Sequence, residues 1–255
     1  MKKTIIIAAA LVAMTACNKN IINEQVAAEA GYGYISLGVT ADTEMVVAKA
    51  DTPDLTGYNV TLKKGEDVVW GPEEYGSIEA DAWKVEAGNY TIYVENLTVA
   101  ETYATEPGVV RVTGQNDVTV TAGVSTSCTV NCRPANSKVS FMYSPEFDVV
   151  FDEPSVSVKE SDARTVEMTV GESHLEANAA YFEPATLTWT LTAKLGGETK
   201  TYSKDFTTVK AKWTQVTFTT GSTDGQIQVT ITVDGEITEV ETITATIDPI
   251  TGDIE

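Results

Sequence analysis

The sequence predicts an all-β protein that folds as two tandem antiparallel β-sandwich domains behind a lipoprotein signal peptide. Three observations support this fold class. Short segments rich in Thr and Val alternate between apolar and polar residues at regular intervals along the chain, a spacing typical of sandwiches and barrels. No window has the 3.6-residue period of an amphipathic helix. A proline-containing joint at residues 133–136 separates two series of these segments.

The first seventeen residues have the order of a bacterial secretory signal. Two lysines are followed by an apolar run at residues 5–12 and by small residues before Cys17. The run is shorter than the about 20 residues that a membrane-spanning helix needs. The segment resembles a lipobox, which predicts that residues 1–16 are removed and that the Cys17 thiol receives a diacylglyceryl group. The alternative is an ordinary signal peptide in which the cysteine occurs by chance.

The first domain is expected at residues 31–134, behind a lipidated Cys17 and a flexible polar tether that together span residues 17–30. A strand at 31–39 is followed by a long loop at 41–56. Two hairpins are predicted, the first around residues 63–67 and the second around residues 86–89. The strands expected after the loop are 58–62, 68–70, 83–85, 90–94, 109–112, 117–121 and 125–132.

The second domain is expected at residues 135–255. Its clearest strand is 227–233, where Ile and Val alternate with Gln and Thr in a period of two. Residues 172–180 allow at most one or two helical turns. Residues 250–255 are expected to be a C-terminal segment without regular structure. The other strands expected are 138–143, 155–159, 165–170, 181–182, 187–195, 199–206, 213–219 and 243–247.

The charge of the chain excludes one class of partner. The formal net charge is −20, and it becomes more negative once residues 1–16 with their two lysines are removed. Such an acidic surface repels nucleic-acid phosphates. It also gives no attraction to anionic lipid headgroups, so the membrane is expected as a partner only through acyl chains on Cys17.

Two further cysteines, Cys128 and Cys132, lie on one face of an expected strand. Four residues of strand span about 13 Å, whereas a disulfide needs Cα atoms within about 7 Å. We therefore expect two buried thiols, and a bridge only if a bulge or turn lies between them. A metal site is not predicted, because the chain has no second Cys pair and no His cluster.

No residue is predicted to be catalytic, and neither a cofactor nor a metal is expected. The single histidine, His174, sits in a probable turn and is expected to be solvated. The chain has no Gly-x-Ser-x-Gly elbow and no phosphate-binding loop. Its paired carboxylates lack EF-hand spacing and are interpreted as charges that keep loops hydrated. These pairs are Asp42/Glu44, Glu66/Asp67, Glu73/Glu74 and Asp248/Asp253.

Aromatic side chains are the candidate ligand-binding residues. Trp70 and Tyr75 flank a Gly-Pro loop, and Trp83 follows shortly after. Exposed aromatics stack on sugars or anchor a protein partner. The alternative is core packing, which we expect for Tyr93 and Trp189 because both sit in strand patterns.

Several segments resemble the DUF4493-type lipoproteins of Bacteroidetes. After the lipobox, the resemblance lies in residues 31–37, 86–92 (Glu-Ala-Gly-Asn-Tyr-Thr-Ile) and 134–139 (Pro-Ala-Asn-Ser-Lys-Val), and it extends over nearly the whole chain. This family is similar in architecture to fimbrillin-like proteins. The resemblance implies sandwich domains of a fimbrillin-like, transthyretin-like or immunoglobulin-like Greek-key type.

The resemblance also implies a non-catalytic lipoprotein of the outer membrane, with the cell surface favoured and the periplasmic face left open as the alternative. Its role would be that of a pilus anchor or adhesion component, with pilus subunits as partners through strand exchange. No arginine occurs between Cys17 and Arg111, so an early Arg-specific trim that releases the lipid is not possible. The alternative is a glycan-binding lipoprotein of a polysaccharide-uptake system.

Overall fold

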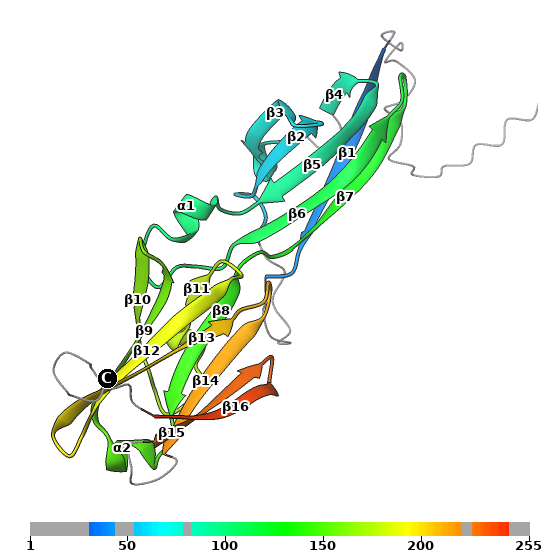
Figure 1. Ribbon diagram of the computed structural model, residues 1–255. Helices are drawn as coiled ribbons and strands as arrows, with labels where there is room; N and C mark the ends of the chain where they lie inside the picture. The colour runs from blue at the N-terminus through cyan, green and yellow to red at the C-terminus, as the bar shows by residue number, and fades with distance from the viewer. Residues whose placement is uncertain (1–30, 44–53, 79–82, 221–225, 245–255) are drawn as a thin grey trace, which may run out of the picture.

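The computed structural model describes residues 31–43, 54–78, 83–220 and 226–244. These residues form an all-β fold of two successive sandwich bodies, with only short helices between strands (Figure 1). The predicted fold class is therefore confirmed. The predicted signal peptide and tether lie outside the described residues, and the predicted domain boundaries stay predictions.

The first half is one seven-stranded sheet folded over its own core. Strands β6 and β7 pair through Val112–Pro134 and Thr113–Arg133 at one end, and the sheet bends there into two wings. One wing consists of β3, β2, β5 and β6, and the other of β7, β1 and β4. Both wings supply apolar side chains to one cluster that runs from Ile35 to Cys132. The strand order is β3-β2-β5-β6-β7-β1-β4. The strands are β1 (Tyr32–Ala41), β2 (Asn59–Lys64), β3 (Asp67–Glu74), β4 (Trp83–Glu86), β5 (Gly88–Glu95), β6 (Val112–Val120) and β7 (Ser125–Pro134).

The second half packs two sheets face to face. One has the order β10-β9-β12-β13 and the other β11-β8-β14-β15-β16. Their inner faces share a core that includes Trp189 and stacked Phe side chains. The strands are β8 (Ser137–Tyr143), β9 (Asp152–Ser161), β10 (Arg164–Met168), β11 (Ala180–Phe182), β12 (Thr186–Leu195), β13 (Glu198–Thr207), β14 (Trp213–Thr220), β15 (Gln226–Val233) and β16 (Glu236–Thr244).

Among the described strands, each half contains one parallel pair, which the prediction of antiparallel sandwiches did not include. β1 pairs in parallel with β7, and β8 pairs in parallel with β14. A parallel pair needs a long crossover connection. In both halves the intervening strands provide this connection, so the first strand of each half lies beside a much later one.

The first predicted hairpin is confirmed and the second is wrong. β2 pairs with β3 as expected, but β4 pairs with β1, whereas β5 pairs with β2 and β6. Both strands extend into the predicted turn and leave only Ala87 between them, whereas tight hairpins use loops of about two residues or more. The chain instead crosses the core from one wing to the other.

Strand boundaries differ from the predictions at several places, and β3 continues to Glu74 through the Gly71-Pro72 segment that was expected to be a loop. Residues 112–120 form the single strand β6 where two strands were expected. Within it, Gly114 lies against β7, where an added Cβ would be 2.7 Å from the Asn131 carbonyl oxygen. β16 begins at Glu236 rather than at Ile243. The rest of the expected final strand, residues 245–247, lies outside the described residues.

In the part of the chain that the structure describes, four short helical segments interrupt the strands. One of them, the 3-10 turn η2 (Glu176–Asn178), falls in the predicted segment 172–180. α1 (Val99–Thr102), α2 (Phe147–Val150) and the 3-10 turn η1 (Tyr75–Ser77) were not predicted. α1 has a capping box between Thr98 and Glu101, a pattern visible in the sequence.

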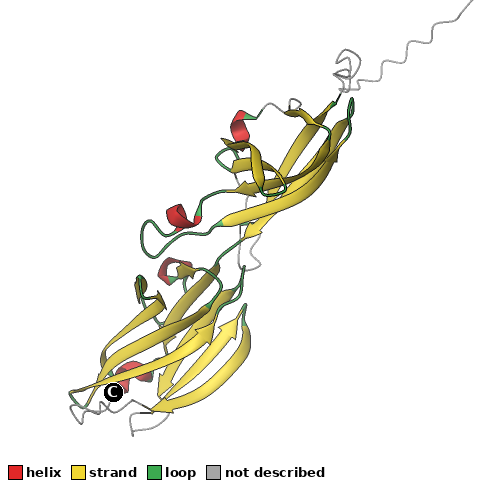
Figure 2. Cartoon of the chain, turned by 45° about the horizontal axis from the view of Figure 1, so that its top comes forward, coloured by secondary structure: helices red, strands yellow, loops and turns green. Residues whose placement is uncertain are grey.

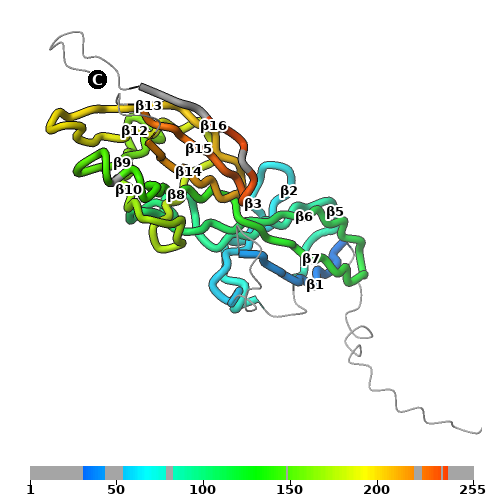
Figure 3. The backbone as a smooth tube through the Cα atoms, turned by 90° about the horizontal axis from the view of Figure 1, so that it is seen from below, coloured from blue at the N-terminus to red at the C-terminus, as the bar shows by residue number. Residues whose placement is uncertain are grey.

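The two halves lie end to end (Figure 2). Figure 3 gives the same arrangement from below, with β1 to β7 at one end and β8 to β16 at the other. α1 and the loop after it reach from the first half to the second beside β10 (Figure 1). This junction is where the two halves exchange polar contacts.

Candidate functional site

Of the three aromatic residues singled out in the sequence, Trp70 and Trp83 pack against each other on the first core, and Tyr75 packs on the same core beyond the end of β3. Trp83 is 7% exposed, and Trp70 and Tyr75 are half-buried against the same cluster. The rings of Trp70 and Trp83 pack edge to face with centroids 4.4 Å apart. Trp83 therefore offers almost no surface to a ligand. Ligand binding by the partly exposed Trp70 and Tyr75 stays a prediction.

The expected core positions of Tyr93 and Trp189 have opposite outcomes. Trp189 is fully buried in the second core, as predicted. Tyr93 is not in the first core, because Ile92 and Val94 on either side face inward and the strand alternates. The Tyr93 side chain lies on the outer face of β5, where its hydroxyl is 3.4 Å from Glu95 Oε2. The prediction for Tyr93 was wrong.

Cys128 and Cys132 are free, buried thiols on β7, as expected. Burial raises the pKa of the Cys132 thiol to about 11. A thiol with a raised pKa and no solvent access is a poor nucleophile. These cysteines are packing residues, whereas Cys17 lies outside the described residues.

His174 is not a solvated loop residue, and that expectation is corrected. Its Nδ1 is 2.9 Å from Ser140 Oγ on β8, and its Nε2 is 3.2 Å from Thr217 Oγ1 on β14. Trp213 Nε1 also donates to Ser140 Oγ, at 2.9 Å. The loop between β10 and β11 crosses the outer face of this sheet and covers the ring, and burial lowers the pKa of His174 to about 4.

This network does not form a hydrolytic triad. Ser140 is fully buried, and both nitrogens of His174 face hydroxyl groups rather than a carboxylate. A nucleophilic serine needs access to a substrate and a base that is itself oriented. The arrangement is that of a satisfied internal polar cluster.

Metal-ligand geometry was also sought among the acidic side chains. Within the four described segments, no group of three or more His, Cys, Asp or Glu side chains lies close enough to hold a metal ion. Glu44, Asp248 and Asp253 of the paired carboxylates lie outside these segments. In the same part of the chain, no helix combines the length and apolar character needed to cross a membrane.

The most organised polar site lies at the junction of the two halves. Arg111, just before β6, reaches across to Glu183 after β11, with Nη2 3.2 Å from a carboxylate oxygen. Tyr103 donates to the same carboxylate at 2.9 Å. The fully buried Asn136 side chain accepts from the Arg111 backbone N–H and donates to the Val109 carbonyl. These contacts join the two halves and the linker, and among the described residues Arg111 Nε is a buried donor without a hydrogen-bond partner.

Arg164 on β10 forms a second link between the halves. Its guanidinium donates two hydrogen bonds of 3.0 Å to Glu106, a bidentate pair. A third hydrogen bond of 2.8 Å goes to Glu160. The same group lies 4.4 Å from the ring centroid of Tyr103 and 4.8 Å from that of Phe182. This clamp holds the loop after α1 against the second half.

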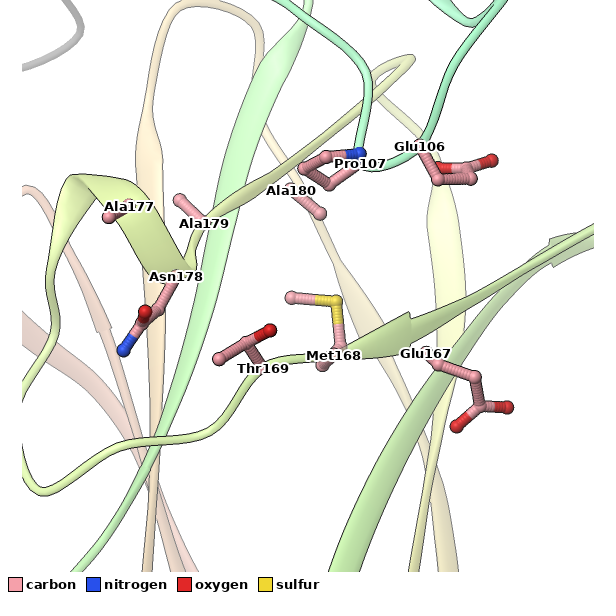
Figure 4. A pocket seen from close by; sticks show the side chains of 9 residues that line it. All are labelled: Glu106, Pro107, Glu167, Met168, Thr169, Ala177, Asn178, Ala179 and Ala180. Carbon is pink, nitrogen blue, oxygen red and sulfur yellow. The ribbon is translucent and has the colours of Figure 1, made fainter.

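Two grooves flank the junction. The smaller, of about 280 Å³, lies between the Glu106–Pro107 loop and the second half, with Met168 and Glu167 on its far side (Figure 4). The larger, of about 450 Å³, lies on the outer face of β5 and β6. Its lining includes Tyr93, Arg111, Gln115, Glu183 and Lys210.

The sequence analysis missed Arg164 and gave Arg111 no structural role. A signal was available, because the chain has only three arginines among its seventeen basic residues. Arginine is favoured where planar, bidentate or stacked contacts are needed. Two of the three arginines, Arg111 and Arg164, lie at the junction.

Residues 31–249 match the model of a protein family described as Domain of unknown function (DUF4493). This match covers most of the chain and confirms the family resemblance. No curated protein matches the chain.

Several solved structures are similar to this chain at low sequence identity. One, described as putative polysaccharide binding proteins (DUF1812) from Bacteroides thetaiotaomicron, is 11% identical with a TM-score of 0.51, over 82% of this chain and 98% of that one. A fimbrial assembly protein from Parabacteroides distasonis is 12% identical with a TM-score of 0.49, over 83% and 100%. The fimbrial anchor protein Mfa2 from Porphyromonas gingivalis is 11% identical with a TM-score of 0.38, over 82% and 100%.

Proposed function

This chain belongs to the DUF4493 family, and on that premise we propose that it is a non-catalytic adhesion or fimbrial component, anchored in the outer membrane by a lipid on Cys17. The lipid would hold the first sandwich near the membrane and leave the second free to meet a partner. To contact a partner outside the cell, the second sandwich would have to lie on the cell surface.

The direction of β1 is the observation that carries the proposal. β1 runs parallel to β7, with Tyr34 opposite Ser125 and Ala41 opposite Cys132. β7 ends at Pro134, where the chain passes into the second half. The start of β1 is therefore at the pole of the first half that lies away from the second half (Figure 1). A tether that enters at this pole places the second half distal to the anchor.

Strand exchange with pilus subunits is the partner mode that fits this architecture. Sandwich sheets end in edge strands whose unpaired backbone groups accept another strand. Among the described strands, β3, β4, β10, β13, β11 and β16 stand at sheet edges. The chain has no arginine before Arg111, so an early Arg-specific cleavage cannot remove the lipid. Such a subunit would stay tethered to the membrane, at the base of a fibre.

Metabolic labelling with a fatty acid tests the anchor. We expect the wild type to be labelled, Cys17→Ala to lose the label, and Cys132→Ala, a matched change of a buried cysteine, to keep it. Equal labelling of wild type and Cys17→Ala would contradict lipid attachment at Cys17.

Protease treatment of whole cells tests the membrane face. An epitope at the C-terminus is expected to be removed from intact cells, because the second half would point outward. Protection until the outer membrane is permeabilised would place the protein on the periplasmic face and overturn the surface role.

A further inference from the structure

The larger groove at the junction, which we call the junction groove, has a sheet face as its floor and the second half as its wall. The floor is the outer face of β5 and β6, and the wall carries one carboxylate and one ammonium group. The lining residues are Tyr93, Arg111, Thr113, Gly114, Gln115, Ala135, Glu183 and Lys210.

The floor continues along the two strands as a row of polar pairs. Residues i and i+2 of a strand share a face, and Tyr93 lies opposite Gln115. The next pair is Thr91 with Asp117, joined by a 2.7 Å hydrogen bond, and then Asn89 with Thr119, joined at 2.9 Å. These pairs line a second groove of about 440 Å³. Together with the pair Glu95–Thr113, the row covers about 20 Å of strand at about 3.4 Å per residue.

The chemistry of the row fits a neutral, polyhydroxylated ligand. Arg111, Lys210 and the Gln115 amide donate hydrogen bonds, whereas the carboxylates of Glu183 and Asp117 accept them. At the junction end two cations, Arg111 and Lys210, are matched by two carboxylates, Glu183 and Glu95, so there is no excess of positive charge for a polyanion. A pocket for an apolar ligand is lined mostly by apolar side chains, and this one is not.

Tyr93 supplies an apolar face among these polar groups. Its ring is half-buried on the groove floor, and Lys63 Nζ lies 5.8 Å from its centroid. Burial raises the pKa of the Tyr93 hydroxyl, so that the group stays protonated and able to donate at neutral pH. An aromatic ring can pack on the C–H face of a sugar ring, while polar side chains beside it form hydrogen bonds with the sugar hydroxyls.

Addition of a peptide strand does not suit this place. β5 lies between β2 and β6, and β6 lies between β5 and β7. β5 pairs with β6 along the whole row and with β2 over most of it, whereas β6 pairs with β7 only at Val112 and Thr113. Because strands pair in the plane of the sheet, the outer face itself presents side chains rather than an edge to an extended peptide. Recognition must come from side chains, as in carbohydrate binding.

We propose that the outer face of β5 and β6, from the junction groove to the row of Thr and Asn residues, binds a neutral oligosaccharide, with Tyr93 as the platform for one sugar ring. The proposal does not rest on lipid attachment or on pilus assembly. Failure of the labelling or protease experiments would leave it standing, and its own failure would leave the anchor role standing.

Calorimetric titration of the full chain with a set of neutral hexasaccharides tests the proposal. The set contains β-1,4-linked glucose, mannose, xylose and galactose, and hexagalacturonate serves as the charged counterpart. At least one neutral hexasaccharide is expected to bind. Tyr93→Ala is expected to weaken that binding at least tenfold and Gln115→Ala severalfold, whereas Tyr93→Phe, which keeps the ring, should stay within about threefold of wild type.

Tyr32→Ala is the matched control, because it removes another partly exposed tyrosine from the same half, also beside a lysine. It should leave binding unchanged. Circular dichroism and thermal melting verify that each variant is folded. The proposal is overturned if no neutral hexasaccharide binds, if only hexagalacturonate binds, or if folded Tyr93→Ala binds as wild type does.

Discussion

At the scale of single residues, His174 shows how a loop side chain becomes half-buried against a sheet. The ring is held between Ser140 and Thr217, under a loop that is also fixed by the 2.7 Å ion pair of Lys138 with Glu176. Lys138 lies over the Trp213 ring at 4.0 Å. Both charged groups lie beside the cluster, and the low pKa of His174 comes from burial.

We expect acid to destabilise the protein through His174. The unfolded chain takes up a proton near the ordinary histidine pKa of 6.5, whereas the folded chain does so near 4. The unfolded state therefore binds more protons between these values, and stability falls as pH falls through this window. Urea unfolding at about pH 7 and about pH 4.5 should show wild type losing about 2 kcal/mol more than His174→Gln.

The glutamine variant is the control because it keeps hydrogen-bonding capacity without titrating in this range. Other carboxylates contribute the same acid dependence to both proteins. Equal loss of stability in wild type and His174→Gln would show that the ring titrates normally.

The buried thiols give a second prediction at this scale. In a Cys17→Ala background, Cys128 and Cys132 should not react with a thiol reagent in the native state at neutral pH, since both are buried and both pKa values are raised. Both should react once the protein is unfolded in urea. Rapid labelling of the native protein would contradict the described packing of β7.

At the scale of elements, glycines allow the strands of the first half to approach closely. Gly71, within β3, has φ of +82°, and a Cβ on it would lie 2.3 Å from the Val60 carbonyl oxygen on β2. The pairing of β2 with β3 shifts register beside this position. Both the backbone conformation and the space therefore require glycine here.

Gly71→Ala is expected to destabilise the protein by about 2–3 kcal/mol, because it combines left-handed strain with a steric clash. Gly65→Ala is the matched control, since Gly65 also has a positive φ, +63°, but nothing lies within 4 Å of its added Cβ. It should cost about 1 kcal/mol. Thermal unfolding of both variants measures the difference, and equal costs would contradict the close approach of β3 to β2.

Sequence pattern predicted most strands but not all of their partners. The alternation in β12 and β15 matches the burial observed, because a period of two fixes which side chains face the core. The position of β4 beside β1 was not predictable in this way. Local pattern marks a strand, whereas its neighbour depends on which wing of the sheet still has an open edge.

At the scale of the whole molecule, the contacts at the junction couple two separate cores. Interfaces between domains are commonly polar and permit movement. Here the Arg164–Glu106 pair is bidentate and stacked on aromatic rings. The linker residue Asn136 is fully buried. These features favour a stiff connection.

Glu106→Gln is expected to cost about 1 kcal/mol and to separate the unfolding of the two halves in calorimetry, because it weakens the pair with Arg164. Glu167→Gln is the matched control. It changes a carboxylate in the same groove (Figure 4), and Glu167 makes no ion pair with the described residues. It should unfold as wild type does. A single shared transition of unchanged midpoint in Glu106→Gln would contradict the coupling.

The sequence by itself determined the all-β class, the succession of strands, the buried cysteines and the family, because these depend on local alternation and on short motifs. Only the tertiary structure decided the parallel pairs, the crossing from β4 to β5, the burial of His174 and the outward position of Tyr93. It also brought Arg111 to Glu183 and Arg164 to Glu106. Residues so far apart in the chain meet only when the sheets close and stack, and no local pattern encodes that meeting.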